Sequence, residues 1–139
     1  MKFFDTSVLV AVVTVHHVHH ARSLKAYLAA RKQGACAAHS LAEVYSTLTR
    51  LPGNQRMECD QAMLVVEDIL QRLHVVELTA EDYYEAITGA VADGITGGTF
   101  YDALIARCAL KVKADAIYTW NARHFQQLGS AIAQLVRTP

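Results

Sequence analysis

Short apolar runs alternate along the chain with longer segments in which apolar residues recur every three or four positions. The short runs are typical of buried strands, and the longer segments are typical of amphipathic helices. The predicted strands are Phe3–Phe4, Ala35–Ala38, Val75–Leu78, Ala116–Thr119 and, at an edge, Ala133–Val136. The predicted helices are Thr6–Val13, Ala21–Gln33, Ser40–Leu51, Glu58–Arg72, Thr79–Asp93, a segment that begins at Thr99, and Asn121–Leu128. This alternation favours a mostly parallel sheet with right-handed crossovers.

Composition narrows the class of protein. A chain of 139 residues is long enough for one domain with a real core, and we expect a single domain over residues 1–139. The hydrophobic fraction of 53% and the charged fraction of 19% suit a sheet that is covered on both faces. The formal net charge is zero, so binding to nucleic acid would need a local basic patch. No apolar segment is long enough to cross a membrane, and three scattered cysteines suit a cytoplasmic location with reduced thiols.

Polar residues stand at four places where a predicted strand or a glycine turn gives way to a helix. They are Asp5, the pair Ser40 and Glu43, the pair Thr99 and Asp102, and the pair Thr119 and Asn121. In an open α/β sheet, ligands bind outside the carboxyl ends of the strands. These side chains are therefore the candidate functional residues of the chain.

The same residues have an alternative interpretation as helix caps. Asp5 and Asn121 are ordinary cap residues, and Ser40-x-x-Glu43 and Thr99-x-x-Asp102 both match the capping box. Thr79-x-x-Asp82 has the same spacing without any link to a site. Spacing alone therefore leaves both interpretations open.

Three of the candidates carry negative charge. Asp5, Glu43 and Asp102 would repel one another if they met at one edge in the ionised form. A hard divalent cation with oxygen ligands, Mg²⁺ or Mn²⁺, would relieve this repulsion. Such an ion activates water and stabilises the charge on a phosphate, which points to phosphodiester hydrolysis.

Four motifs in order resemble the signature of the PIN domain and, more narrowly, of the VapC ribonuclease toxins of bacterial toxin–antitoxin pairs. They are Phe3-Phe4-Asp5-Thr6-Ser7, Ser40-x-x-Glu43, Tyr101-Asp102-Ala103-Leu104-Ile105-Ala106, and Thr119-x-Asn121 with Phe125. The resemblance implies a three-layer α/β/α sandwich and a metal-dependent endoribonuclease that a small antitoxin inhibits. It implies a metal site of Asp5, Glu43 and Asp102, with supporting hydroxyls at Thr6, Ser40 and Thr119.

The chain departs from the family pattern at Asn121, where many members have a fourth acid. An amide still hydrogen-bonds a metal-bound water, so Asn121 stays in the predicted catalytic set. It brings no charge, which leaves open a non-catalytic scaffold that has lost tight metal binding.

Other side chains are candidates for substrate or partner contact. Arg50 and Arg56 flank the Pro52-Gly53-Asn54 break, and Arg123 follows Asn121, so these three are the predicted contacts to RNA phosphates. Arg107, Lys111 and His124 are further basic candidates, with a solvated surface as the alternative for all of them. The histidines between His16 and His20 are interpreted as the exposed entry to a helix, because no Cys or carboxylate nearby completes a metal site; metal binding and stacking on RNA bases are the alternatives. High apolar content also predicts a surface that pairs with a second copy.

Overall fold

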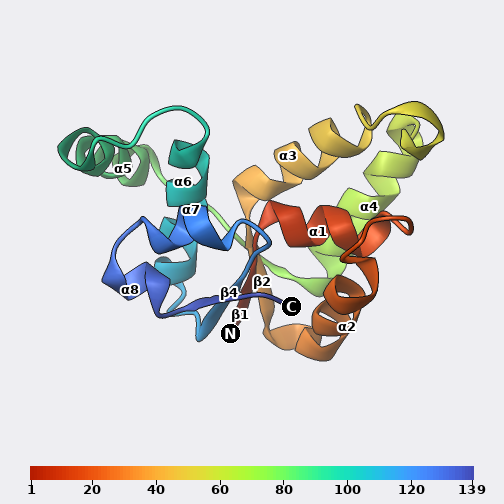
Figure 1. Cartoon of the computed structure of the whole chain (residues 1–139), viewed down its shortest axis with the longest axis horizontal. Helices are drawn as coiled ribbons and strands as arrows, with labels where there is room; N and C mark the ends of the chain where they lie inside the picture. Colours follow the sequence, from red (N-terminus) through yellow and green to blue (C-terminus); the bar gives the residue numbers. More distant parts are fainter.

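A parallel sheet of five short strands forms the centre of the molecule (Figure 1). The computed structural model describes residues 1–139, and the strands lie in the order β3-β2-β1-β4-β5. Their bounds are Lys2–Phe4 (β1), Gly34–Ala37 (β2), His74–Val76 (β3), Ala116–Tyr118 (β4) and Val136–Arg137 (β5). All neighbouring pairs are parallel, which confirms the predicted sheet.

Helices cover both faces of this sheet and complete the expected α/β/α sandwich. Figure 1 shows α1 to α4 on one side and α6 to α8 on the other. Their bounds are Thr6–Val13 (α1), His20–Ala30 (α2), Ala38–Leu48 (α3), Cys59–Arg72 (α4), Ala80–Asp93 (α5), Thr99–Lys111 (α6), Ala122–Gln126 (α7) and Ser130–Ala133 (α8). Short 3₁₀ turns lie at Arg31–Gln33 and Gly53–Gln55.

Two hydrophobic clusters, one on each face, hold the layers together. Phe3 and Phe4 are both fully buried, and they belong to different clusters because successive strand residues point to opposite faces. Phe3 packs with residues of α6, α7 and α8, whereas Phe4 packs with residues of α1 to α4. The first strand is therefore the shared centre of both halves of the core, and its carboxyl end is fixed from both sides.

Some predicted boundaries were wrong. The predicted strand Ala133–Val136 was wrong, because α8 ends at Ala133 and β5 begins only at Val136. Ile132 of α8 and Val136 of β5 pack into the same core cluster, so an apolar helix end and an apolar strand follow each other directly. Helix α3 begins at Ala38 rather than at Ser40, directly after β2 and without a side-chain cap. No polar residue marks that start, so local sequence could not locate it. None of the helices combines the length and the apolar character needed to span a membrane.

The contact between β2 and the end of α4 gives a prediction about stability. A Cβ added at Gly34 would lie 2.5 Å from Leu73 Cδ2 and 3.3 Å from Phe4, whereas one added at Gly89 would meet nothing within 4 Å. We expect Gly34→Ala to lower the free energy of unfolding by roughly 1–3 kcal/mol through overpacking. Gly89→Ala, inside α5, should raise it by about 0.5–1 kcal/mol. Urea unfolding of both variants measures these changes, and an unchanged Gly34→Ala protein would contradict the close packing.

Candidate functional site

The site lies where the order of the strands reverses. From β1 the chain goes to β2 and β3 on one side, and β4 and β5 return on the other, so β1 and β4 are neighbours at the switch point. Ligands bind at such points in open α/β sheets, outside the carboxyl ends of the strands. A cavity of about 430 Å³ lies there, and its lining includes Asp5, Thr6, Glu43, Asp102 and Asn121. Of the candidate residues, the cavity brings together Asp5, Glu43, Asp102 and Asn121 at one edge of the sheet, whereas Ser40, Thr99 and Thr119 do not line it.

Asp5 follows β1 and is 1% exposed. Its Oδ2 accepts hydrogen bonds from Ser7 N (3.3 Å), Ser7 Oγ (2.5 Å) and Thr119 Oγ1 (2.8 Å). The bond from Ser7 N makes Asp5 the N-cap of α1, so the cap interpretation is correct for this oxygen. None of these three hydrogen bonds uses Oδ1, and Asp5 lines the cavity, so Oδ1 is the oxygen suited to a ligand there.

Glu43 and Asp102 repeat this arrangement, with one oxygen held and the other open. Glu43 Oε1 accepts a hydrogen bond from Thr6 Oγ1 (3.1 Å) and lies 3.4 Å from His39 Nε2. Asp102 Oδ2 lies 3.0 Å from His124 Nδ1. Neither Glu43 Oε2 nor Asp102 Oδ1 takes part in a hydrogen bond within the chain. Each acid is therefore oriented by its neighbours and keeps one free acceptor.

The capping-box interpretation fails for these two acids. Helix α3 is capped at Ala37 and α6 at Gly98, in both cases without a side-chain hydrogen bond. At Thr79 the same spacing does form a capping box, in which Asp82 accepts the Thr79 N–H at 2.9 Å. The side chains of Glu43 and Asp102 therefore do not cap their own helices and instead line the cavity.

The predicted supporting hydroxyls differ in what they contact. Thr6 donates to Glu43, and Thr119 donates to Asp5. Ser40 does neither, because its buried Oγ has no hydrogen-bond partner in the chain. Ser7 was not among the predicted supporting hydroxyls, yet its hydroxyl donates to Asp5 and accepts the Trp120 N–H at 3.0 Å. The signal was its position two residues after the acid, where a hydroxyl reaches back to a carboxylate.

The electrostatics of the cluster favour a positive ligand. Burial raises the pKa of Asp5, and hydrogen bonds from Ser7 and Thr119 offset only part of this rise. Burial also raises the pKa of Glu43, to which the charge of Asp5 adds. Burial together with the charge of Asp5 raises the pKa of Asp102 to about 6. Three acids that resist ionisation around one cavity would be stabilised in their charged form by a cation.

The donor set fits a hard divalent ion that keeps part of its water shell. In this structure no three His, Cys, Asp or Glu side chains are arranged to hold an ion directly. Mg²⁺ commonly binds through one or two carboxylates and retains several waters, so three direct ligands are not required. The open carboxylate oxygens of Asp5, Glu43 and Asp102 are suitable for direct contact with the ion. The amide of Asn121 is suitable for a hydrogen bond to one of the ion's water molecules.

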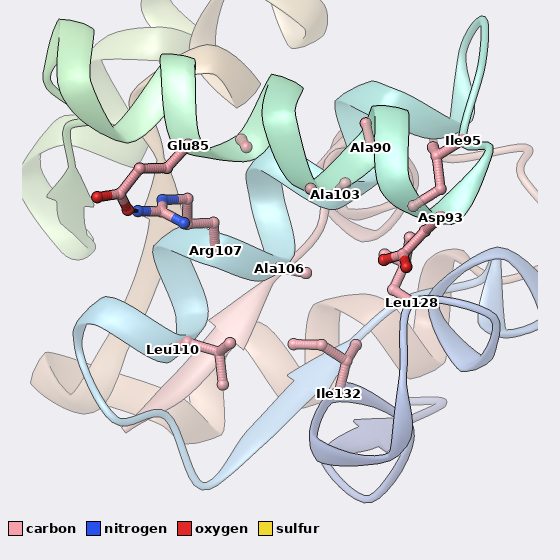
Figure 2. A pocket seen from close by; sticks show the side chains of 12 residues that line it. Glu85, Ala90, Asp93, Ile95, Ala103, Ala106, Arg107, Leu110, Leu128 and Ile132 are labelled. Carbon is pink, nitrogen blue, oxygen red and sulfur yellow. Dashed lines mark hydrogen bonds and ion pairs between the residues drawn. The ribbon is translucent and has the colours of Figure 1, made fainter.

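The predicted RNA-contacting arginines lie outside the cavity lining. Arg50, Arg56 and Arg123 are exposed, and Arg56 Nε donates to Leu51 O at 3.2 Å. Two further basic candidates are paired elsewhere: Arg107 with Asp82 and Glu85, and Lys111 with Asp82 at 2.8 Å. Figure 2 shows Arg107 and Glu85 beside a separate, mainly apolar pocket of about 190 Å³ between α5, α6 and α8. Among these basic candidates, only His124 contacts an acid of the cavity, namely Asp102.

The histidine-rich segment between α1 and α2 reaches the cavity from the other side of Asp5. His17, Val18 and His19 line the cavity together with Trp120. His19 stacks on Trp120 with ring centroids 3.6 Å apart and an interplanar angle of 8°. The sequence places the histidines at the entry to a helix but does not indicate the stacking of His19 on Trp120, because that contact joins residues 101 positions apart.

A family model for the PIN domain matches residues 2–130 of the chain. Among curated proteins, Ribonuclease VapC27 of Mycobacterium tuberculosis is 37% identical over 120 residues, which cover 86% of this chain and 83% of that protein.

Solved structures share the fold at lower identity. VapC20 of Mycobacterium tuberculosis, described as a toxin that cleaves the sarcin–ricin loop, has a TM-score of 0.74 at 18% identity and covers 89% of this chain and 92% of its own. VapBC2 of Rickettsia felis, bound to a DNA fragment from its promoter, has a TM-score of 0.66 at 18% identity, with 99% and 97% covered. VapBC-1 of nontypeable Haemophilus influenzae has a TM-score of 0.63 at 16% identity, with 99% and 96% covered.

The raised pKa of Asp102 predicts how stability changes with pH in the absence of metal. Because the native carboxyl binds its proton more tightly than the unfolded one, stability should fall as pH rises from about 4 to about 6 and then level off. Asp102→Asn removes the ionisation, so it should unfold less readily than wild type at about pH 8 in EDTA, by on the order of 2 kcal/mol. Melting curves across this pH range measure the effect.

Glu67→Gln changes one exposed charge and is the control, so it should show no gain in stability. A lower melting temperature for Asp102→Asn than for wild type would mean that the Asp102 carboxylate is structural.

Proposed function

Because this chain belongs to the PIN-domain family, we propose that it is a VapC-type endoribonuclease that hydrolyses RNA phosphodiester bonds with the help of Mg²⁺ or Mn²⁺. The similarity to Ribonuclease VapC27 extends over most of the chain and supports ribonuclease activity. The observation that supports hydrolysis at this cavity is that three acids each have one oxygen held by a neighbour and one left open.

The proposed roles follow from these contacts. Asp5, Glu43 and Asp102 would hold the ion, which when bound lowers the pKa of water and stabilises charge on the phosphate. Ser7 and Thr119 fix Asp5, and His124 fixes Asp102, so the open oxygens keep their directions while substrate binds. Such fixed geometry reduces the reorganisation that the reaction would otherwise need.

Substrate approach requires positive charge near the acids. Arg50, Arg56 and Arg123 are exposed and outside the cavity lining, so we propose that they contact the RNA backbone away from the cleaved bond. Contacts of this kind position the substrate without reading its sequence.

We also propose a small antitoxin as a partner and a cytoplasmic location. Two relatives of the same fold are named as VapBC assemblies, which supports a partner of this type. An antitoxin segment with a basic residue directed at Asp5 and Asp102 would neutralise the acids and block the substrate at the same time.

The alternative is a non-catalytic scaffold that keeps the fold and has lost tight metal binding. Asn121 is the residue that favours it, because one neutral amide stands where a fourth acid is expected. The three open carboxylate oxygens argue against it, since a scaffold has no need for one buried and two partly buried acids whose pKa values are raised.

Substitution of the acids tests the proposed activity. Asp5→Asn and Asp102→Asn should each abolish Mg²⁺-dependent RNA cleavage while circular dichroism shows an intact fold, and EDTA should inhibit wild type. Asp60→Asn, on the exposed first turn of α4, is the matched control and should cleave normally. Calorimetric titration with Mn²⁺ separates the two functions, because a scaffold would show no heat of binding. Full cleavage by either site variant would refute the assignment.

Self-association is a further part of the proposal. Helix α5 exposes Tyr84 (73%), Ile87 (50%) and Val91 (78%), an apolar surface of the kind that commonly pairs with another molecule. We expect light scattering to show a dimer at micromolar concentration, and Ile87→Glu with Val91→Glu to yield a monomer. A monomeric wild type at high micromolar concentration would contradict this prediction.

A further inference from the structure

The segment between α1 and α2 has no evident task in the hydrophobic core, yet it forms one wall of the catalytic cavity. Val18 is 85% exposed, and Val15 is 70% exposed. Nevertheless His17, Val18 and His19 line the cavity that also contains Asp5 and Asp102. The half-buried rings of His17, His19 and Trp120 beside the proposed hydrolytic centre call for an explanation in terms of what the cavity binds.

The rings of this wall are held rigidly. Trp120 donates its indole N–H to the buried Ser23 Oγ at 2.9 Å and its backbone N–H to Ser7 Oγ at 3.0 Å. His19 stacks in parallel on the indole. The Arg22 guanidinium carbon lies 5.1 Å from the centroid of the Trp120 ring, within the range of a cation–π contact. The result is a flat aromatic surface with a positive charge beside it.

This surface is coupled directly to the acidic centre. Ser7 accepts the Trp120 N–H and donates its own hydroxyl to Asp5 Oδ2, so one side chain joins the two. A base that stacks on the outer face of His19, whose other face is covered by Trp120, is therefore placed at a fixed position relative to Asp5. Fixed spacing of this kind is what a polymer of regular repeat, such as RNA, would need.

The contacts within the segment argue against a metal site of its own. His17 Nδ1 accepts the His19 backbone N–H at 3.1 Å, and His20 Nδ1 lies 3.0 Å from Ala11 O. No group of three or more potential ligands forms there. The histidine rings contribute flat surfaces instead, which is the property that base recognition uses.

We propose that the His19–Trp120 stack, with Arg22 beside it, is the subsite that holds an unpaired nucleobase of the RNA next to the cleaved phosphodiester. Single-stranded RNA is recognised by stacking of its bases on aromatic side chains and on arginine. The inference rests on the proposed function for the identity of the ligand. The proposed subsite would position the RNA by one of its bases, so it would distinguish single-stranded RNA from a sugar–phosphate chain without bases.

The chain provides its own optical probe, because Trp120 is its only tryptophan. We would titrate the protein in EDTA with a single-stranded adenylate pentamer and, separately, with a pentamer of abasic ribose phosphates of equal charge. The adenylate pentamer should change Trp120 emission and bind roughly tenfold or more tightly than the abasic one. Equal affinity for the two pentamers would overturn the proposal, because phosphate contacts alone would then account for binding.

Three variants test which side chain is responsible. His19→Ala should weaken pentamer binding roughly tenfold and raise KM for cleavage while kcat stays near the wild-type value. His19→Phe keeps a flat ring and should bind nearly as wild type does. His16→Ala changes an exposed histidine of the same segment and is the matched control.

Wild-type affinity in His19→Ala would overturn the proposal. If His19→Ala fails to fold, Arg22→Gln, at an exposed position, should still show a several-fold loss of affinity, and no loss would overturn the proposal.

The outcomes separate this inference from the proposed function. Base-dependent emission changes in a protein that never cleaves RNA would support the subsite and count against the nuclease. Normal cleavage by wild type with an unchanged KM in His19→Ala would overturn the subsite alone. If His19→Ala weakens binding of an antitoxin segment and leaves binding of the pentamer intact, the surface is a protein-binding one and the inference fails.

Discussion

Three hydrogen bonds that converge on a single oxygen, Asp5 Oδ2, connect the two halves of the site. Ser7 and Thr119 donate to it, and each of their hydroxyls in turn accepts a backbone N–H, from Trp120 and from Asn121 respectively. The loop after β4 is thereby tied to the start of α1 across the switch point of the sheet. Because a buried carboxylate without such partners is very costly, the loop and the acid depend on each other.

The same convergence explains how a buried acid can serve two purposes. The hydrogen bonds from Ser7 and Thr119 all go to Oδ2, so the cap of α1 and the ordering of the loop do not occupy Oδ1. The contrast with Asp82 is informative, because Lys111 and the capping bonds at Thr79 hold the pKa of that carboxyl well below its usual range. A structural acid is stabilised in its charged form by partners, whereas the acids of the cavity have raised pKa values.

The sequence alone was sufficient to predict the parallel sheet and the gathering of the acids, because both depend on local patterns and on the rule that parallel strands end at one edge. It was insufficient wherever a contact joins distant segments. Nothing near Asp102 indicates His124, and nothing near His19 indicates Trp120. Capping-box spacing was misleading at Glu43 for the same reason, since Thr6 and His39 offer that carboxylate a tertiary alternative to its own helix end.

Asn121 has a physical justification within this arrangement. Its backbone N–H is used by Thr119, and its side chain lines the cavity without capping α7. A fourth carboxylate at this position would add negative charge close to Asp5 and Asp102, whose ionisation is already opposed by burial and by their mutual repulsion. The amide keeps a polar group for a bound water and lowers the charge that a cation must neutralise. Three acids and one amide therefore give the cavity one negative charge fewer than four acids would, so the departure from the family pattern lowers the mutual repulsion of the acids.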